Sequence, residues 1–145
     1  MSTQTFDAIF KKVEEAKTKK EKLHILKKNS SPVLKQILGL TYDPRVEWLL
    51  PEGIPPHTPL PRDMDAEITL QYASRQFYLF VKGDTETQRN LKQLKRESLF
   101  IQLLESVNPA EVKILLGMSS RKLPYKGVTR KLVAEAFPNL AKDWF

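Results

Sequence analysis

The chain has no cysteine among its 145 residues. Disulfide bonds, thiolate metal sites and cysteine nucleophiles are therefore excluded, and the composition fits a reducing compartment. No segment approaches the run of about 18 apolar residues that a membrane span requires. Residues 1–10 also lack the basic and apolar regions of a secretory signal. We therefore expect a cytoplasmic protein that has no membrane partner.

Residues typical of catalytic sites are also scarce. His24 and His57 are the only histidines, and neither has the spacing of a metal site. The sequence contains neither a Gly-x-Ser-x-Gly elbow nor a Gly-x-x-x-x-Gly-Lys-Ser/Thr phosphate loop. Most acids lie beside a base, as Glu14 and Glu15 do near Lys17, which is typical of a solvated helix face. We expect no enzymatic activity, no metal, no cofactor and no small-molecule substrate.

Helical periodicity dominates what is present. Only five glycines occur, whereas ten prolines mark the joints between segments. Apolar residues recur at helical spacing, as at Phe6, Ile9, Phe10 and Val13. We predict one all-α domain over residues 1–145, a compact bundle of about six to eight helices. The helices are predicted over 5–16, 18–29, 31–42, 65–82, 86–107, 110–117 and 129–137, and five of them begin at the N-caps Thr5, Thr18, Ser31, Asn108 and Thr129.

Three segments are less regular or more ambiguous. Five prolines between 51 and 61 predict a rigid extended loop, either a strap over the core or a binding loop. The aromatic and β-branched content of 65–82 leaves a strand as an alternative to a helix. In the helix over 86–107 we expect Leu94 in the core, with Lys92, Lys95 and Arg96 on the outer face.

The charge balance favours a polyanionic partner. Lysine and arginine number 24 against 17 acids, which gives a net charge of +7. Such a protein attracts nucleic acid, acidic membranes or acidic protein faces. A first cluster between residues 11 and 35 holds nine lysines and three acids. A solubilising helix surface is the alternative interpretation of this cluster.

A second cluster is sharper, because six basic residues and no acid lie between 113 and 131. A loop rich in hydroxyls leads there into a predicted helix N-terminus, where free N–H groups and the helix dipole favour phosphate. Gly127 would permit close backbone approach. The alternative is a crossing between core helices with incidental charge. The predicted nucleic-acid-binding residues are Ser119, Ser120, Arg121, Lys122, Lys126, Gly127, Thr129, Arg130 and Lys131, with Lys17, Lys19, Lys20 and Lys22 from the first cluster.

Several runs of the sequence resemble a known DNA-binding domain. The run 17–29 followed by 34–42 is similar to the start of the ATP-dependent DNA ligases of T-even bacteriophages. The runs 113–118, 127–131 and 136–140 are similar to the end of the N-terminal domain of those enzymes. The chain also resembles short stand-alone proteins of T-even-like phages.

The resemblance implies an all-α scaffold that clamps duplex DNA, with a phosphate-binding loop over 119–131. It does not imply ligation. The catalytic Lys-x-Asp-Gly motif is absent, and Lys82, Gly83 and Asp84 do not form it. The proline-rich loop 51–61 also departs from the ligase pattern.

These observations predict a non-enzymatic phage accessory protein in the host cell cytoplasm. It would bind duplex DNA through phosphate contacts without strong sequence specificity. Few aromatic residues lie among the bases, which disfavours single-strand binding. The alternative is a phage protein that binds host RNA polymerase, or phage replication or transcription proteins, and modulates transcription. Trp48, Trp144 and Phe145 would then contact the protein partner. For Trp144 and Phe145 the alternative is packing of the C-terminal tail onto the core.

Overall fold

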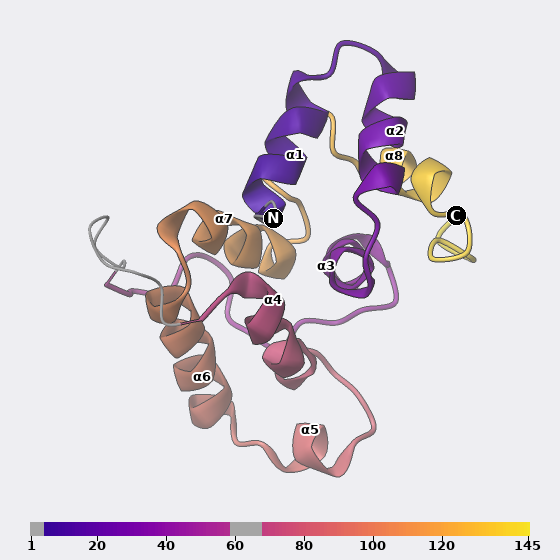
Figure 1. Cartoon of the computed structure of the whole chain (residues 1–145). Helices are drawn as coiled ribbons and strands as arrows, with labels where there is room; N and C mark the ends of the chain where they lie inside the picture. Colours follow the sequence, from indigo (N-terminus) through magenta and orange to yellow (C-terminus); the bar gives the residue numbers. More distant parts are fainter. Residues whose placement is uncertain (1–4, 59–67) are drawn as a thin grey trace.

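The computed structural model describes residues 5–58 and 68–145. Within these ranges the protein is all-α, as predicted, with eight α-helices, one 3₁₀-helix and no strand (Figure 1). The elements are α1 (Phe6–Glu15), α2 (Lys19–Lys28), α3 (Pro32–Tyr42), α4 (Leu70–Ala73), the 3₁₀-helix η1 (Ser74–Phe80), α5 (Glu86–Asn90), α6 (Gln93–Ser106), α7 (Pro109–Ser119) and α8 (Arg130–Ala136).

The predicted helix starts are confirmed by their capping hydrogen bonds. Thr5 Oγ1 accepts from Ala8 N at 3.1 Å, and Thr129 Oγ1 accepts from Leu132 N at 3.1 Å. Each such bond satisfies one of the N–H groups that the first turn of a helix leaves unpaired. The same arrangement holds at Thr18, Ser31 and Asn108.

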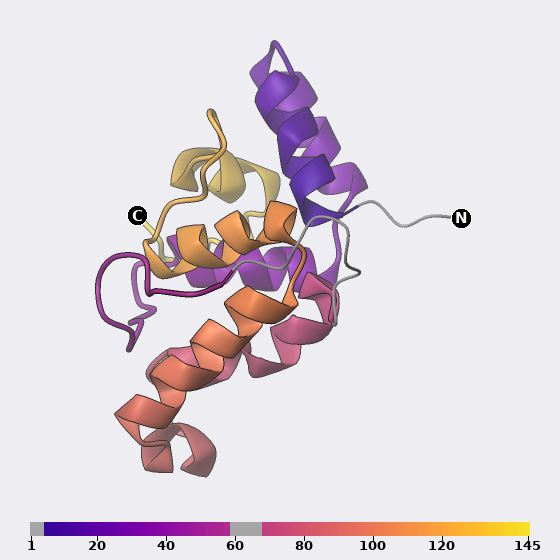
Figure 2. The same ribbon diagram turned by 90° about the vertical axis from the view of Figure 1, so that its left-hand side faces the viewer.

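The helices form three groups along the molecule, one at each end and one in the middle (Figures 1 and 2). Helices α1 and α2 lie side by side as a hairpin at one end, where α8 packs against α2. Helix α3 packs against α7 in the middle, and α6 with η1 and α5 builds the other end. The middle holds much of the core, because Leu34 and Ile37 of α3 and Ile114 of α7 are completely buried.

The segment predicted as a helix over 65–82 is less regular. Residues 65–67 lie outside the described residues. The rest forms one short α-turn, α4, and then η1. Ser74, Phe77 and Phe80 are all buried, and this spacing of three matches the repeat of a 3₁₀-helix better than that of an α-helix. The strand alternative survives only as two isolated bridges in the described part of this segment, Trp48 with Val81 and Ile68 with Val107.

The single helix predicted over 86–107 is wrong, because two helices meet there at an extended break. Leu91 and Lys92 have ψ angles of 122° and 145°. Gln88 O, which an unbroken helix would pair with Lys92 N, instead accepts from Arg96 Nη2 at 3.1 Å. The change of register leaves Leu94 83% exposed and Arg96 only 5% exposed, the reverse of what the sequence predicted.

The stretch around Trp48 is held by backbone pairing to the end of η1. Leu49 N donates to Phe80 O at 2.8 Å, and Lys82 N donates to Glu47 O at 2.9 Å. Residues 51–58 then continue without regular structure, as the prolines predicted. Positions 59–61 of the predicted proline-rich loop lie outside the described residues. This anchored stretch places Trp48 and the prolines beside α7.

Candidate nucleic-acid interface

The structure brings most of the two predicted basic clusters together. The loop before α8 lies against the α1–α2 hairpin, where Lys126 N donates to Glu14 Oε2 at 2.5 Å. A Cβ atom added at Gly127 would lie 3.2 Å from Lys22 Nζ. One turn earlier in α2, Lys19 pairs with Glu135 of α8 at 2.6 Å. Segments more than 100 residues apart in sequence therefore share one end of the molecule.

Two of the predicted lysines have internal partners. Lys22 Nζ donates to Val13 O at 2.7 Å and so satisfies one of the last carbonyls of α1. Lys19 forms the ion pair with Glu135. Both side chains help to join the hairpin, the loop and α8, and their contact with DNA stays a prediction.

Two arginines of the second cluster cap the C-terminal end of α3. Arg121 Nη1 donates to Leu40 O at 3.0 Å, and its Nη2 donates to Asp43 O. Arg130 Nε donates to Tyr42 O at 2.8 Å. Cations are favoured at this negative end of the helix dipole. Arg121 and Arg130 therefore cap α3, and their contact with phosphate stays a prediction.

The environment of Arg121 agrees with this role. Burial lowers the pKa of its guanidinium, and the nearby charge of Arg130 lowers it further, while Asp43 opposes both. The backbone of Arg121 is also in the left-handed region, with φ of 72°. A non-glycine residue in this conformation costs some free energy, which the two capping hydrogen bonds offset.

The predicted hydroxyl contacts are also used internally. Ser119 Oγ donates to Leu116 O at 3.0 Å, and Ser120 Oγ donates to Gly117 O at 3.2 Å. Thr129 is the N-cap of α8 and accepts from Leu132 N. Gly127 has φ of 87°, so glycine is needed there for the shape of the turn. The hydroxyl groups of the predicted phosphate-binding loop thus already bond to backbone groups nearby in the chain.

Five predicted residues remain exposed, and over the described ranges their side chains make no internal hydrogen bond or ion pair. They are Lys17, Lys20, Lys122, Lys126 and Lys131. All except Lys122 belong to the α1–α2 turn, the first turn of α2, the loop before α8 and the first turn of α8. Together, residues 12–22 and 126–135 hold eight cations and four acids. We define Lys17, Lys20, Lys126 and Lys131 as the lysine cap.

The buried carboxylate of Asp7 anchors this end of the molecule, and no sequence motif marks it. Asp7 is 6% exposed, and it accepts from Tyr125 Oη at 2.6 Å. Lys113 lies 3.0 Å and Lys11 lies 3.4 Å from the same carboxylate. Burial alone would raise the pKa of Asp7, but the hydrogen bonds from Tyr125 and Lys113 and the two lysine charges outweigh it and lower that pKa.

Asp7 thereby fixes the loop that carries Lys126. Tyr125 is 3% exposed, its ring lies 5.2 Å from that of Phe10, and burial together with Asp7 raises the pKa of its hydroxyl. Asp7 and Tyr125 are 118 residues apart, so no short-range spacing in the sequence predicts this pair.

A second buried acid, Glu111, supports one pH prediction. Its Oε2 accepts from Phe6 N at 3.2 Å, and it is 7% exposed. Burial and the charge of Asp7 raise its pKa. A raised carboxyl pKa means that the charged form lowers folding stability above that pKa, and that the loss is recovered as pH falls through it.

Glu111→Gln keeps an acceptor oxygen but removes the charge. We expect this variant to be more stable than the wild type at pH 7, with a difference that shrinks as pH falls toward the ordinary range of glutamate. Urea unfolding at a series of pH values measures it. A difference that grows on acidification would contradict the assignment.

The pattern of one protein family matches residues 9–125, which is most of the chain. The chain belongs to the family of unknown function DUF6433. No curated protein and no solved structure shows significant similarity to it. The family match spans α1 to α7 and ends at Tyr125, one residue before Lys126.

The predicted protein-contact residues of this DUF6433 chain have different environments. Trp144 is 4% exposed, so its prediction as a surface anchor is wrong: the residue packs in the core. Phe145 is 84% exposed. Trp48 is half-buried, with its Nε1 donating to Leu40 O at 2.9 Å, and it lines a surface groove.

Two further features of this DUF6433 chain concern metal sites and membrane spans. Among residues 5–58 and 68–145, no group of three or more histidines and acids is placed to hold a metal ion. In the same part of the chain, no helix combines the length and apolar character needed to cross a membrane.

Proposed function

We propose that this DUF6433 chain is a non-enzymatic protein that binds duplex DNA through phosphate contacts, without strong sequence specificity. The observation that supports this most is the convergence of two basic segments on one end of the molecule, where the lysine cap stays exposed. Ion pairs and helix caps hold the supporting elements in place, so binding would order only the four lysine side chains. The resemblance to the N-terminal domain of phage DNA ligases points to the same ligand.

The type of basic residue in the lysine cap favours recognition of phosphates rather than of bases. The lysine cap holds lysines but no arginine, since Arg121 and Arg130 are occupied at the end of α3. Lysine acts as a point charge toward phosphate, whereas specific base contacts in the major groove most often use arginine. In the cellular setting we propose a phage accessory role in the host cytoplasm.

Fluorescence anisotropy with a labelled duplex of mixed sequence, across a series of salt concentrations, tests this function. Four phosphate contacts predict that log K falls against log salt with a slope of about −3 to −4, at affinities of about 10⁻⁴ to 10⁻⁶ M. Duplexes of different sequence are expected to bind alike. Absence of binding at low salt would contradict the proposed binding of duplex DNA.

A protein partner is the second candidate function, and Trp48 is the residue that favours it. Of the two tryptophans it is the one that reaches the surface. An acidic face of host RNA polymerase, or of a phage replication or transcription protein, would match the positive charge of the chain. Capture of purified polymerase by the immobilised protein, without any DNA binding, would favour this candidate.

A further inference from the structure

A groove runs along the segment 50–54, on a different part of the surface from the lysine cap. Two hollows of about 280 and 850 Å³ share this segment and Ser119. Helix α6 closes the smaller hollow, whereas α7 and the turn after it close the larger one. The larger hollow falls within the range of about 300–1,000 Å³ that is typical of ligand pockets.

One wall of the groove is apolar and already ordered. Ile54 is 71% exposed at its edge, and Leu50 and Trp48 are half-buried beneath. The indole of Trp48 is fixed by its hydrogen bond to Leu40 O. Prolines at 51, 55 and 56 restrict the backbone, so that little conformational entropy remains to be lost on binding.

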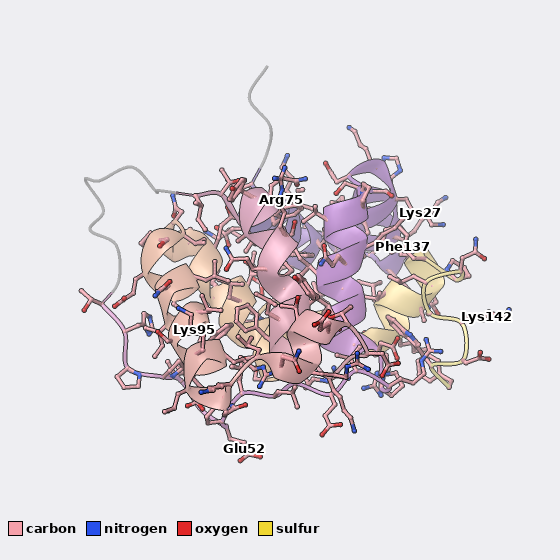
Figure 3. All side chains as sticks on the ribbon, turned by 90° about the horizontal axis from the view of Figure 1, so that it is seen from below. Lys27, Glu52, Arg75, Lys95, Phe137 and Lys142 are labelled. Atoms are coloured by element: carbon pink, nitrogen blue, oxygen red, sulfur yellow. The ribbon has the colours of Figure 1, made fainter. Side chains whose placement is uncertain are left out.

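The end of the groove beside α7 is positively charged. Lys113, Arg121 and Lys122 line it, against the single acid Glu52. Lys113 is already paired with Asp7, but Arg121 donates to neutral carbonyls and Lys122 makes no internal ion pair in the described structure. Glu52 projects from the outer edge of the molecule (Figure 3). An acidic group would therefore find uncompensated positive charge next to the apolar wall.

We propose that this groove binds a short segment of a protein partner in which apolar side chains stand next to aspartate or glutamate. The apolar side chains would cover Ile54 and Leu50, and the carboxylates would pair with Lys122. Arg121, whose two terminal nitrogens donate to Leu40 O and Asp43 O, would add only its charge. The exposed isoleucine beside a proline-restricted segment supplies the contact area, and the cations fix the direction of the segment. This inference is independent of the proposed binding of DNA by the lysine cap.

The test uses the full chain, labelled for NMR, and a short synthetic peptide of alternating leucine and aspartate. We expect shifts of the Trp48 indole, the Ile54 methyl groups and the Lys122 amide. Ile54→Asp and Lys122→Glu are each expected to weaken the peptide at least tenfold. A peptide in which lysine replaces aspartate is expected not to bind.

Leu94→Asp is the matched control for the apolar contact, because Leu94 is 83% exposed but lies outside the groove. It is expected to leave peptide binding unchanged. No groove shifts at millimolar peptide, shifts confined to another surface, or equal losses for Ile54→Asp and Leu94→Asp would each overturn the proposal. Ile54→Asp is expected to bind duplex DNA as the wild type does, so failure here is distinguishable from failure of the DNA proposal.

Discussion

Replacing all four lysines of the lysine cap by alanine is expected to weaken duplex binding by about three and a half orders of magnitude at about 0.1 M salt. Each phosphate contact releases condensed counterions, which corresponds to roughly eightfold in affinity at that salt concentration. Lys17, Lys20, Lys126 and Lys131 make no internal ion pair within the described residues, so their removal leaves the scaffold intact. Fluorescence anisotropy gives the affinity, and the thermal unfolding midpoint confirms that the fold is unchanged.

A second variant at the opposite end of the molecule removes the same charge. It replaces exposed cations at and around α5 and α6, which lie far from the α1–α2 hairpin in both views (Figures 1 and 2). These residues are Lys82, Arg89, Lys92 and Lys95. Over such a distance, salt near 0.1 M screens most of the long-range attraction, so a small loss is expected. Equal losses from both variants would mean that binding follows net charge and has no defined site.

Arg96→Leu is expected to lower the free energy of unfolding by about 2–4 kcal/mol. The guanidinium donates to Leu79 O at 2.9 Å, to Gln88 O at 3.1 Å and to Gln93 Oε1 at 2.7 Å, and so ties η1, α5 and α6 together. Leucine fills part of the space but supplies no donor. Acceptors left unpaired in the buried site each cost about 1–3 kcal/mol.

Lys95→Leu is the matched control, because Lys95 is the neighbour on α6 and points into solvent (Figure 3). Its expected change is within about 0.5 kcal/mol. Urea unfolding of the two variants measures both values. An Arg96→Leu protein as stable as the Lys95→Leu protein would show that the three hydrogen bonds contribute little.

Arg96 and Leu94 also show where sequence reasoning reached its limit. Charge and periodicity place an arginine outside and a leucine inside, and over one unbroken helix that inference is sound. The break at Leu91 and Lys92 is accompanied by hydrogen bonds to carbonyls outside the window 86–107, from Arg96 Nε to Leu79 O at 2.9 Å and from Gln93 Nε2 to Leu49 O at 2.6 Å. Nothing within the window 86–107 encodes these partners.

The helix starts were predictable for the opposite reason. An N-cap bond joins residues three apart or fewer, as between Ser31 Oγ and Leu34 N at 3.1 Å, so the local sequence contains all of it. The all-α class followed from the same local signals. The short 3₁₀-helix η1 was not predicted, because apolar residues three apart, such as Phe77 and Phe80, also occur on one face of an α-helix.

The sequence indicated which basic segments would come together, but not which hydrogen bonds each residue makes. Clustered bases identified the segments that the structure brings together. The end of α3, however, needs donors for its last carbonyls, and a sequence does not show which distant arginine will supply them. Clustered charge therefore indicates Arg121 and Arg130 as phosphate contacts, whereas in the structure they donate hydrogen bonds to Leu40 O and Tyr42 O.

The lysine cap is tested most directly by an NMR titration of the labelled protein with a short duplex. We expect amide shifts to gather at residues 16–20, 125–127 and 130–132 and to fade as salt is added. The groove around Trp48 and Lys122 is predicted to stay unchanged. Shifts that centre on that groove, or that spread evenly over all exposed lysines, would contradict a duplex-binding site at the lysine cap.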